Sequence, residues 1–85
     1  MTGVPETVAL RAALADQIRR ARKRCAFSQE ELAWRSGLHR TYISMIERAQ
    51  RSPTVDSLEK IAAALGISAS ALLARAEESG RRQPR

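Results

Sequence analysis

The sequence has few of the residues that catalysis, metal binding and covalent cross-linking usually require. Its 85 residues include one cysteine and one histidine, Cys25 and His39. A single cysteine excludes an internal disulfide and fits a reducing cytoplasm. We find neither a metal-ligand spacing nor a glycine-rich phosphate loop, and Cys25 and His39 fall on different predicted helices. The sequence therefore predicts no enzyme, no metal site, no cofactor and no small-molecule ligand.

Long apolar runs and aromatic side chains are also scarce. Aromatic residues make up 4% of the chain although 44% of it is hydrophobic, a balance that suits closely packed short helices. No apolar run approaches the length of a membrane span, and the N-terminus lacks the basic-then-apolar layout of a signal peptide. We therefore expect a cytoplasmic protein without a membrane partner. A chain this short forms one small domain, which a partner subunit would stabilise.

Positive charge is in excess, with a formal net charge of +6. The three arginines of segment 80–85 supply half of that charge, and a basic tail alone is weak evidence of a partner. Arg40, Arg48 and Arg51, however, cluster around one predicted helix. This clustering predicts a polyanionic partner.

Two short helices joined by a tight turn are predicted within residues 29–46. Ala33 is small where a second helix must cross closely, and Gly37 can take the positive φ that a sharp turn between helices needs. The apolar positions that would fix the crossing angle are Leu32, Leu38, Ile43 and Ile46. This is the pattern of a helix-turn-helix, and we expect its second helix over residues 39–47.

The outward side chains of that second helix indicate that it reads DNA. They are hydrogen-bond donors, hydroxyls and one thioether, with no acid before Glu47: His39, Arg40, Thr41, Ser44, Met45 and Arg48. Arginine offers a bidentate fork for guanine, while threonine and serine can bond to either base-pair partner. We predict that Arg40, Thr41 and Ser44 read bases and that the DNA backbone is held by Gln29, Tyr42, Arg48 and Arg51. The alternative is an ordinary solvated helix face.

Three segments resemble the xenobiotic-response-element class of helix-turn-helix regulators, which includes phage repressors of the lambda type. These segments are SQEELA, SGLHRTYIS followed by IER, and SPTVDSLEKIAAALGIS. The run HRTYIS with the following IER is most similar to the controller proteins of restriction–modification systems. The likeness covers about residues 14–76, and it implies an all-α, lambda-repressor-like domain of five helices and a DNA-binding homodimer. It also implies a structural ion pair between Arg22 and Glu47.

Start and stop signals predict the remaining helices. The signals are Pro5 and Glu6 for a first helix that ends near Arg24 or Cys25, and Ser28 with Glu31 as a capping box for the second. Thr54 and Gly66 mark the bounds of the fourth helix, and Ser68 marks the start of the fifth. We expect Val55 on the apolar face of the fourth helix. Alanine stands at two turns, Ala26 and Ala49, where the resembling proteins usually carry glycine. A left-handed alanine would cost about 1–2 kcal/mol, so at Ala49 either this strain is accepted or the helix closes differently.

The fifth helix carries more apolar surface than one small core can bury. Leu72 and Leu73 point about 100° apart, and Ile67 adds to the excess. In the resembling proteins this region pairs two subunits, so Ile67, Leu72 and Leu73 are the predicted dimer interface. We expect residues 1–79 to form the DNA-binding and dimerisation domain and residues 80–85 to form a disordered basic tail.

These features together predict a sequence-specific, double-stranded-DNA-binding transcriptional regulator. It would act as a homodimer on a palindromic operator, because two reading helices related by a two-fold axis enter successive major grooves about 34 Å apart. The alternatives are a protein-interaction module or an antitoxin that reuses the same fold.

Overall fold

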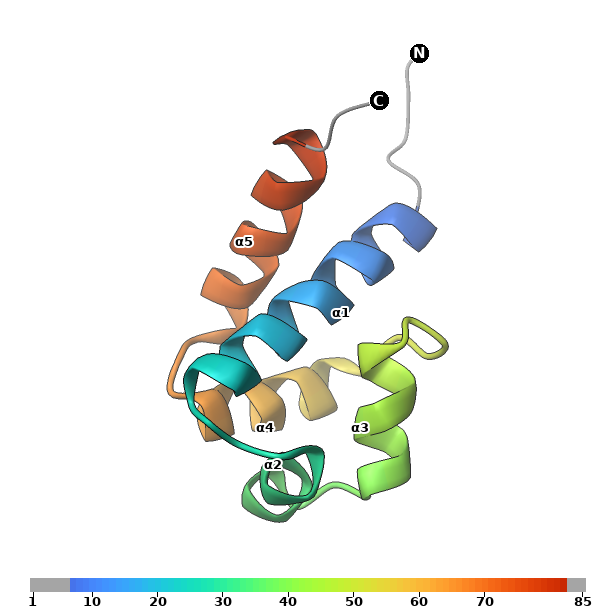
Figure 1. Cartoon of the computed structure of the whole chain (residues 1–85). Coiled ribbons are helices and arrows are strands. Elements are labelled where there is room, and N and C mark those ends of the chain that lie inside the picture. The colour runs from blue at the N-terminus through green and yellow to red at the C-terminus, as the bar shows by residue number, and fades with distance from the viewer. Residues whose placement is uncertain (1–6, 83–85) are drawn as a thin grey trace.

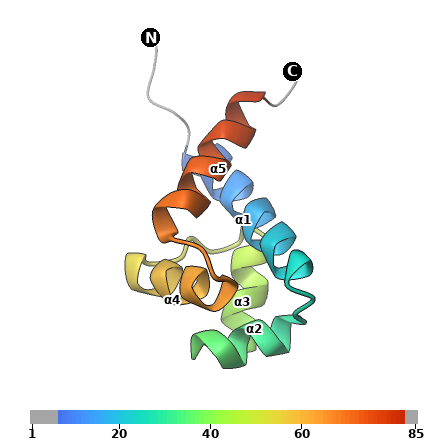
Figure 2. The same cartoon turned by 90° about the vertical axis from the view of Figure 1, so that its left-hand side faces the viewer.

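Five α-helices make up the secondary structure of the described residues, 7–82, in the computed structural model of the chain, and no strand occurs among them. The helices are α1 (Thr7–Arg24), α2 (Gln29–Ser36), α3 (Arg40–Glu47), α4 (Val55–Leu65) and α5 (Ala69–Arg82). In Figures 1 and 2, α5 runs alongside α1, and α2, α3 and α4 gather at one end of this pair. The predicted all-α fold of five helices is confirmed.

Each helix contributes an apolar stripe to one core. The largest of the wholly buried hydrophobic side chains at its centre are Ile18, Leu32, Ile43, Ile46, Ile61 and Leu72. Val55 is the exception to the predicted pattern, because 82% of its surface is exposed. It is the first residue of α4, at the end of the helix, where the core side chains do not cover it. The prediction that Val55 lies on the apolar face is therefore wrong.

Side-chain caps start three of the helices. The Oγ atoms of Ser28, Thr54 and Ser68 accept hydrogen bonds from the backbone N–H groups of Glu31, Ser57 and Ala71, at 2.9, 3.0 and 3.0 Å. The carboxylate of Glu31 pairs instead with Arg35 Nε at 2.7 Å. Only one half of the predicted capping box therefore forms, and an ion pair one turn along the helix replaces the other half.

Left-handed residues close the first four helices. They are Ala26, Gly37, Ala49 and Gly66, with φ angles of 61°, 75°, 59° and 78°. After Ala49, the N–H of Gln50 donates to the carbonyl of Met45 at 2.8 Å, which is the longer bond of a Schellman closure. Alanine thus takes the glycine conformation at two turns, at a cost of about 1–2 kcal/mol each.

The helix-turn-helix segment follows the predicted bounds. Helix α2 ends at Ser36, Gly37 makes the turn, and α3 begins at Arg40 with His39 as its N-cap. Helix α5 continues through Gly80 to Arg82, into the segment that we predict as a disordered tail. The predicted first turn at Pro5 and Glu6 and the last residues of the predicted tail lie outside the described residues.

No single helix of the described part of the chain is long and apolar enough to cross a membrane. Helices α4 and α5 reach the length and apolar composition of a membrane span only when they are taken together, and the chain bends by 96° between them. The core helices of other proteins can have the same length and composition. Helices α4 and α5 each contribute a wholly buried side chain to the core, Ile61 and Leu72 respectively.

Candidate nucleic-acid interface

Helix α3 has one buried face and one open face. Its buried residues are Ile43, Ile46 and Glu47. A rotation of about 100° per residue turns Thr41, Met45 and Arg48 to the opposite side, where Thr41 and Arg48 are exposed and Met45 is half-buried. The core thus determines which side chains of α3 can meet a ligand.

The three predicted base-reading residues share one side of this helix. Arg40 and Thr41 are exposed in the first turn, and Ser44 is half-buried one turn later. Helical geometry places them within about 100° of one another. Met45 lies four residues after Thr41 on the same open side, and it is absent from the predicted set. The i, i+4 spacing was the signal that could have included it.

His39 precedes this side of the helix. It is exposed and holds the N-cap position of α3, but its side chain makes no capping hydrogen bond. Its imidazole therefore does not satisfy the first N–H groups of α3, which lie at the positive end of the helix dipole.

A buried ion pair fixes the far end of α3 to α1. Arg22 Nε donates to Glu47 Oε2 at 2.7 Å, and Arg22 Nη2 donates to Glu47 Oε1 at 3.0 Å. The Arg22 side chain is 12% exposed and that of Glu47 is 2% exposed. The main-chain carbonyl of Glu47 also accepts a bond of 2.7 Å from Arg19 Nη1. The structure thus brings together the two residues of the predicted ion pair, which hold α3 against α1.

Gln29, a predicted backbone contact, belongs to the same network. Its Nε2 donates to Glu47 Oε1 at 3.0 Å, so its side-chain amide already has a partner within the protein. Gln29 is also the first residue of α2, and its own backbone N–H points out of the helix end. That N–H is a group left for an anion, and the side-chain amide has one of its two N–H donors already occupied by Glu47.

The other predicted backbone contacts surround the end of α3. Arg48 is exposed, and its Nε lies 3.4 Å from the carbonyl of Ser44. Arg51 is exposed in the following loop, with its guanidinium carbon 5.5 Å from the centroid of the Tyr42 ring. Positive charge therefore gathers at the end of α3 and in the loop that follows it.

The hydroxyl of Tyr42 is bonded within the protein. It donates to Ser57 Oγ at 3.1 Å and lies 3.4 Å from the backbone nitrogen of Thr54. The pKa of Tyr42 is lowered from its ordinary value of 10.0, chiefly because the Ser57 hydroxyl can donate a hydrogen bond to the phenolate form. Thr54 and the positive charge of Arg51 act in the same direction, and burial opposes them.

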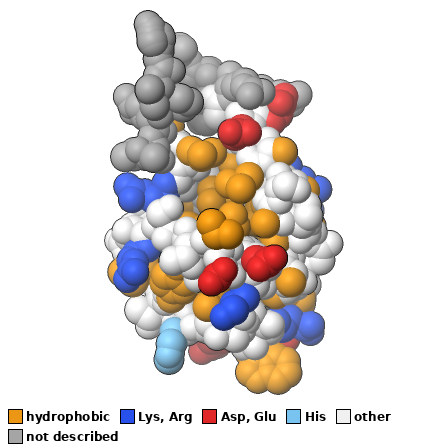
Figure 3. Space-filling view, turned by 180° about the vertical axis from the view of Figure 1, so that it is seen from behind, with side chains coloured by type: hydrophobic (Ala, Val, Ile, Leu, Met, Phe, Trp, Pro, Cys, Tyr) orange, Lys and Arg blue, Asp and Glu red, His pale blue; other side chains and the backbone are white. Residues whose placement is uncertain are grey.

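The predicted dimer residues divide between the core and the surface. Leu72 is wholly buried inside the subunit, so its predicted role in the dimer interface is wrong. Helix α5 has to bury one stripe against α1 and α4, and Leu72 lies on that stripe. Leu73 and Ile67 pack at the edge of the core and remain half-buried. Figure 3 shows hydrophobic side chains gathered in the middle of the face seen from behind.

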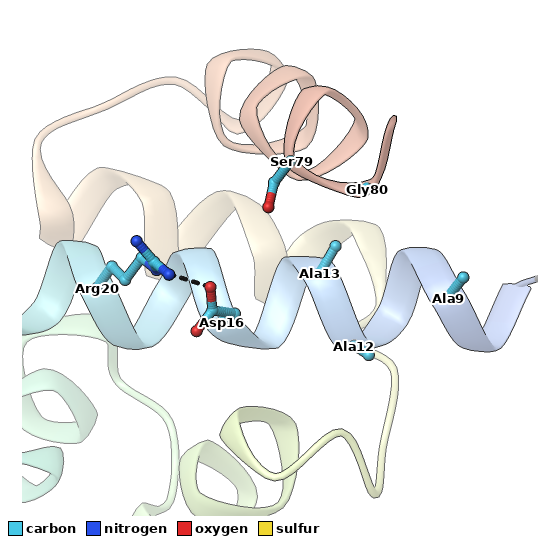
Figure 4. A pocket seen from close by; sticks show the side chains of 7 residues that line it. All are labelled: Ala9, Ala12, Ala13, Asp16, Arg20, Ser79 and Gly80. Atoms are coloured by element: carbon cyan, nitrogen blue, oxygen red, sulfur yellow. Dashed lines mark hydrogen bonds and ion pairs between the residues drawn. The ribbon is translucent and has the colours of Figure 1, made fainter. Parts of the chain in front are cut away.

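A groove of about 520 Å³ lies between α1 and the end of α5 (Figure 4). It is lined by Ala9, Ala12, Ala13, Asp16, Arg20, Ser79 and Gly80. Arg20 Nε and Asp16 Oδ2 form an ion pair of 2.7 Å at its side. None of the lining residues belongs to α2 or α3, so this groove is separate from the candidate interface.

Comparison with known proteins gives consistent matches. The sequence profile of the helix-turn-helix family matches residues 18–72. A "Neisseria hypothetical transcription factor" from Neisseria meningitidis serogroup B is 44% identical over 75 residues, which cover 88% of this chain and 71% of that protein. Control protein C.SmaI from Serratia marcescens is 47% identical over 62 residues, covering 73% and 74% respectively.

A solved structure matches the whole arrangement of helices. It is the restriction–modification controller protein C.Esp1396I, as a tetramer in complex with its natural 35 base-pair operator. The TM-score is 0.78 at 34% identity, and the match covers 86% of this chain and 96% of that one.

Proposed function

The chain belongs to the helix-turn-helix family, and from this premise we propose that it is a transcriptional regulator that binds a specific sequence of double-stranded DNA as a homodimer. Its likeness to lambda-repressor-like proteins, and to restriction–modification controller proteins among them, is confirmed by the matches. The names of these relatives describe a transcription factor and control proteins, and we propose a regulatory rather than an enzymatic role for this chain. A DNA-binding role places the protein inside the cell, and we propose the cytoplasm.

The open face of α3 carries this proposal. Thr41 lies opposite the residues of α3 that are buried in the core, Ser44 lies beside them, and Arg40 is exposed in the first turn. In this class of motif the N-terminal part of the second helix reaches the base edges of the major groove. We assign the bidentate recognition of a guanine to Arg40 and the neighbouring base contacts to Thr41 and Ser44.

Phosphate contacts would hold that helix in register. We assign them to the groups that flank the reading side: Gln29, Tyr42, Arg48 and Arg51. For Gln29 the group is the backbone N–H at the start of α2, where the helix dipole favours an anion. Phosphate contacts of this kind supply affinity without sequence information.

We further propose that two subunits pair through the half-buried Ile67 and Leu73. Apolar side chains that are only half covered in the subunit gain burial when a partner packs on them. A two-fold dimer would place its two α3 helices in successive major grooves about 34 Å apart. The operator would then be palindromic.

Titration of a mixed-sequence duplex at several salt concentrations tests the proposal. We expect the logarithm of the binding constant to fall linearly with the logarithm of the salt concentration, by about 0.9 for each phosphate neutralised. Arg48→Ala should reduce this slope. Arg75→Ala removes the same charge from the exposed surface of α5 and should not change it. Binding without salt dependence, or no binding at all, would contradict the proposal and favour a protein-interaction module.

A further inference from the structure

A connected group of polar side chains lies between α3, the following loop and the start of α4. Tyr42 donates to Ser57 Oγ at 3.1 Å, and Thr54 Oγ1 donates to the same oxygen at 2.8 Å. The backbone nitrogen of Thr54 lies 3.4 Å from the Tyr42 hydroxyl. We name Tyr42, Thr54 and Ser57 the tyrosine support, because the bonds among them hold the ring of Tyr42. The guanidinium of Arg51 lies over this ring.

The tyrosine support joins the candidate interface to the interior of the protein. Ser57 is only 8% exposed, so its hydroxyl meets Tyr42 and Thr54 rather than a ligand. Tyr42 itself is half-buried, and its ring lies 5.5 Å from the guanidinium carbon of the exposed Arg51. A guanidinium is attracted to an aromatic face within about 6 Å, but only a ring held in place can give the guanidinium a fixed direction.

The backbone around Arg51 is anchored to α3 as well. Its N–H donates to the carbonyl of Met45 at 3.3 Å, and the N–H of Gln50 donates to the same carbonyl at 2.8 Å. With its main chain anchored, the freedom left to Arg51 is largely in its long side chain. A side chain of this length loses much rotamer freedom when it is immobilised at an interface.

From this geometry, and resting on the proposed function, we infer that Ser57 and Thr54 are positioning residues for DNA binding. By holding the hydroxyl of Tyr42, they fix the ring that orders Arg51 before the duplex arrives. Less side-chain freedom is then lost on binding, so affinity rises without any contact between Ser57 and DNA. The Ser57 hydroxyl that accepts the bond from Tyr42 also lowers the pKa of Tyr42, because it can donate to the phenolate when Tyr42 is deprotonated.

A double-mutant cycle on DNA binding tests the inference. Ser57→Ala, Arg51→Ala and the double variant are titrated with the duplex pool that the wild-type protein enriches from random sequences. Ser57→Ala should weaken binding about fivefold, a size typical of coupled neighbours. It should cost little further affinity once Arg51 is already alanine. Equal losses from Ser57→Ala in both backgrounds, or no loss in either, would overturn the inference.

Ser36→Ala is the matched control for the loss of a buried hydroxyl. Ser36 is 7% exposed, and its hydroxyl donates to the carbonyl of Ala33 within α2 at 3.2 Å. This variant should bind the duplex pool within twofold of the wild type, as expected for a site with no partner in common with Arg51. A loss equal to that of Ser57→Ala would show a general effect of buried hydroxyls and would overturn the inference.

An ultraviolet titration of the DNA-free protein measures the pKa of Tyr42 without interference from other tyrosines, because Tyr42 is the only tyrosine in the chain. Ser57→Ala should raise the pKa of Tyr42 towards its ordinary value, and Ser36→Ala should leave it unchanged. An unchanged pKa in the Ser57 variant would overturn the inference, whatever the DNA result.

If Arg40→Ala weakens binding while Arg51→Ala does not, the inference fails and the proposed function stands. If the wild type binds no duplex, the proposed function fails.

Discussion

Replacing Glu47 by glutamine removes the charge that holds the reading helix to α1. The Glu47 carboxylate accepts three bonds, from Arg22 Nε, Arg22 Nη2 and Gln29 Nε2, at 2.7, 3.0 and 3.0 Å. A glutamine keeps one acceptor oxygen and directs an NH₂ group at donors that have no lone pair to offer. The guanidinium of Arg22 stays 12% exposed, with its counter-charge gone.

The expected loss follows from this burial. Breaking a buried pair by removing one partner typically costs about 3–5 kcal/mol, because an uncompensated charge remains. For a domain of this size each kcal/mol shifts the melting temperature by about 4–8 °C. Glu47→Gln should therefore lower the melting temperature by about 12 °C or more. The loss is a large part of the roughly 5–15 kcal/mol that stabilises a typical domain.

Thermal unfolding followed by circular dichroism measures the effect, and Glu31→Gln is its matched control. Glu31 also pairs with an arginine, at 2.7 Å from Arg35 Nε, but the two side chains are 41% and 47% exposed. An exposed pair of this spacing contributes about 0.3–0.5 kcal/mol, so this variant should melt close to the wild type. Equal melting temperatures for the two variants would refute the buried role of Glu47.

Three further predictions concern the turn, the dimer and the duplex. Replacing Ala49 by glycine should raise the free energy of unfolding by about 1 kcal/mol, because glycine takes a positive φ without the clash of a Cβ. A lower melting temperature would show that the strain is not there. Leu73→Glu should give folded monomers in sedimentation while the same change at Leu72 unfolds the subunit, and a dimeric Leu73 variant would remove that residue from the interface. Arg40→Ala should cost about 1–3 kcal/mol per half-site and relax one base preference, whereas Arg51→Ala should weaken binding to all duplexes alike. Selection from random duplexes with each variant would show the docking to be wrong if this pattern were reversed.

The helix boundaries followed from local signals in the sequence because those signals agree with one another, whereas the arrangement of five helices followed from the family resemblance. The turn at Gly37 and the caps at Thr54 and Ser68 set the helix ends where the apolar periods also stop. Agreement between cap, turn and period leaves little freedom to the chain. For that reason, the end of α2 and the starts of α4 and α5 were predictable from these residues alone.

Side-chain partners were less predictable than helices. A helical period places Leu72 and Leu73 about 100° apart, but only the packing of α5 against the other helices decides which one is buried. The partners of Gln29 and Tyr42, which are Glu47 and Ser57, are 18 and 15 residues away in the sequence. Spacing rules along a helix do not reach contacts of that separation. The backbone conformation of Ala49 could not be predicted for a further reason, because the sequence shows the type of a residue and not its φ angle.

DNA reading by the open face of α3 is tested most directly by selecting bound sequences from a random duplex pool, with the wild-type protein and with Arg40→Ala. We expect the wild type to enrich a palindrome whose half-sites lie about 34 Å apart, centre to centre. The variant should enrich the same palindrome without the preference at one base pair of each half-site. No enriched sequence with the wild type, or unchanged base preferences with the variant, would contradict a reading role for this helix.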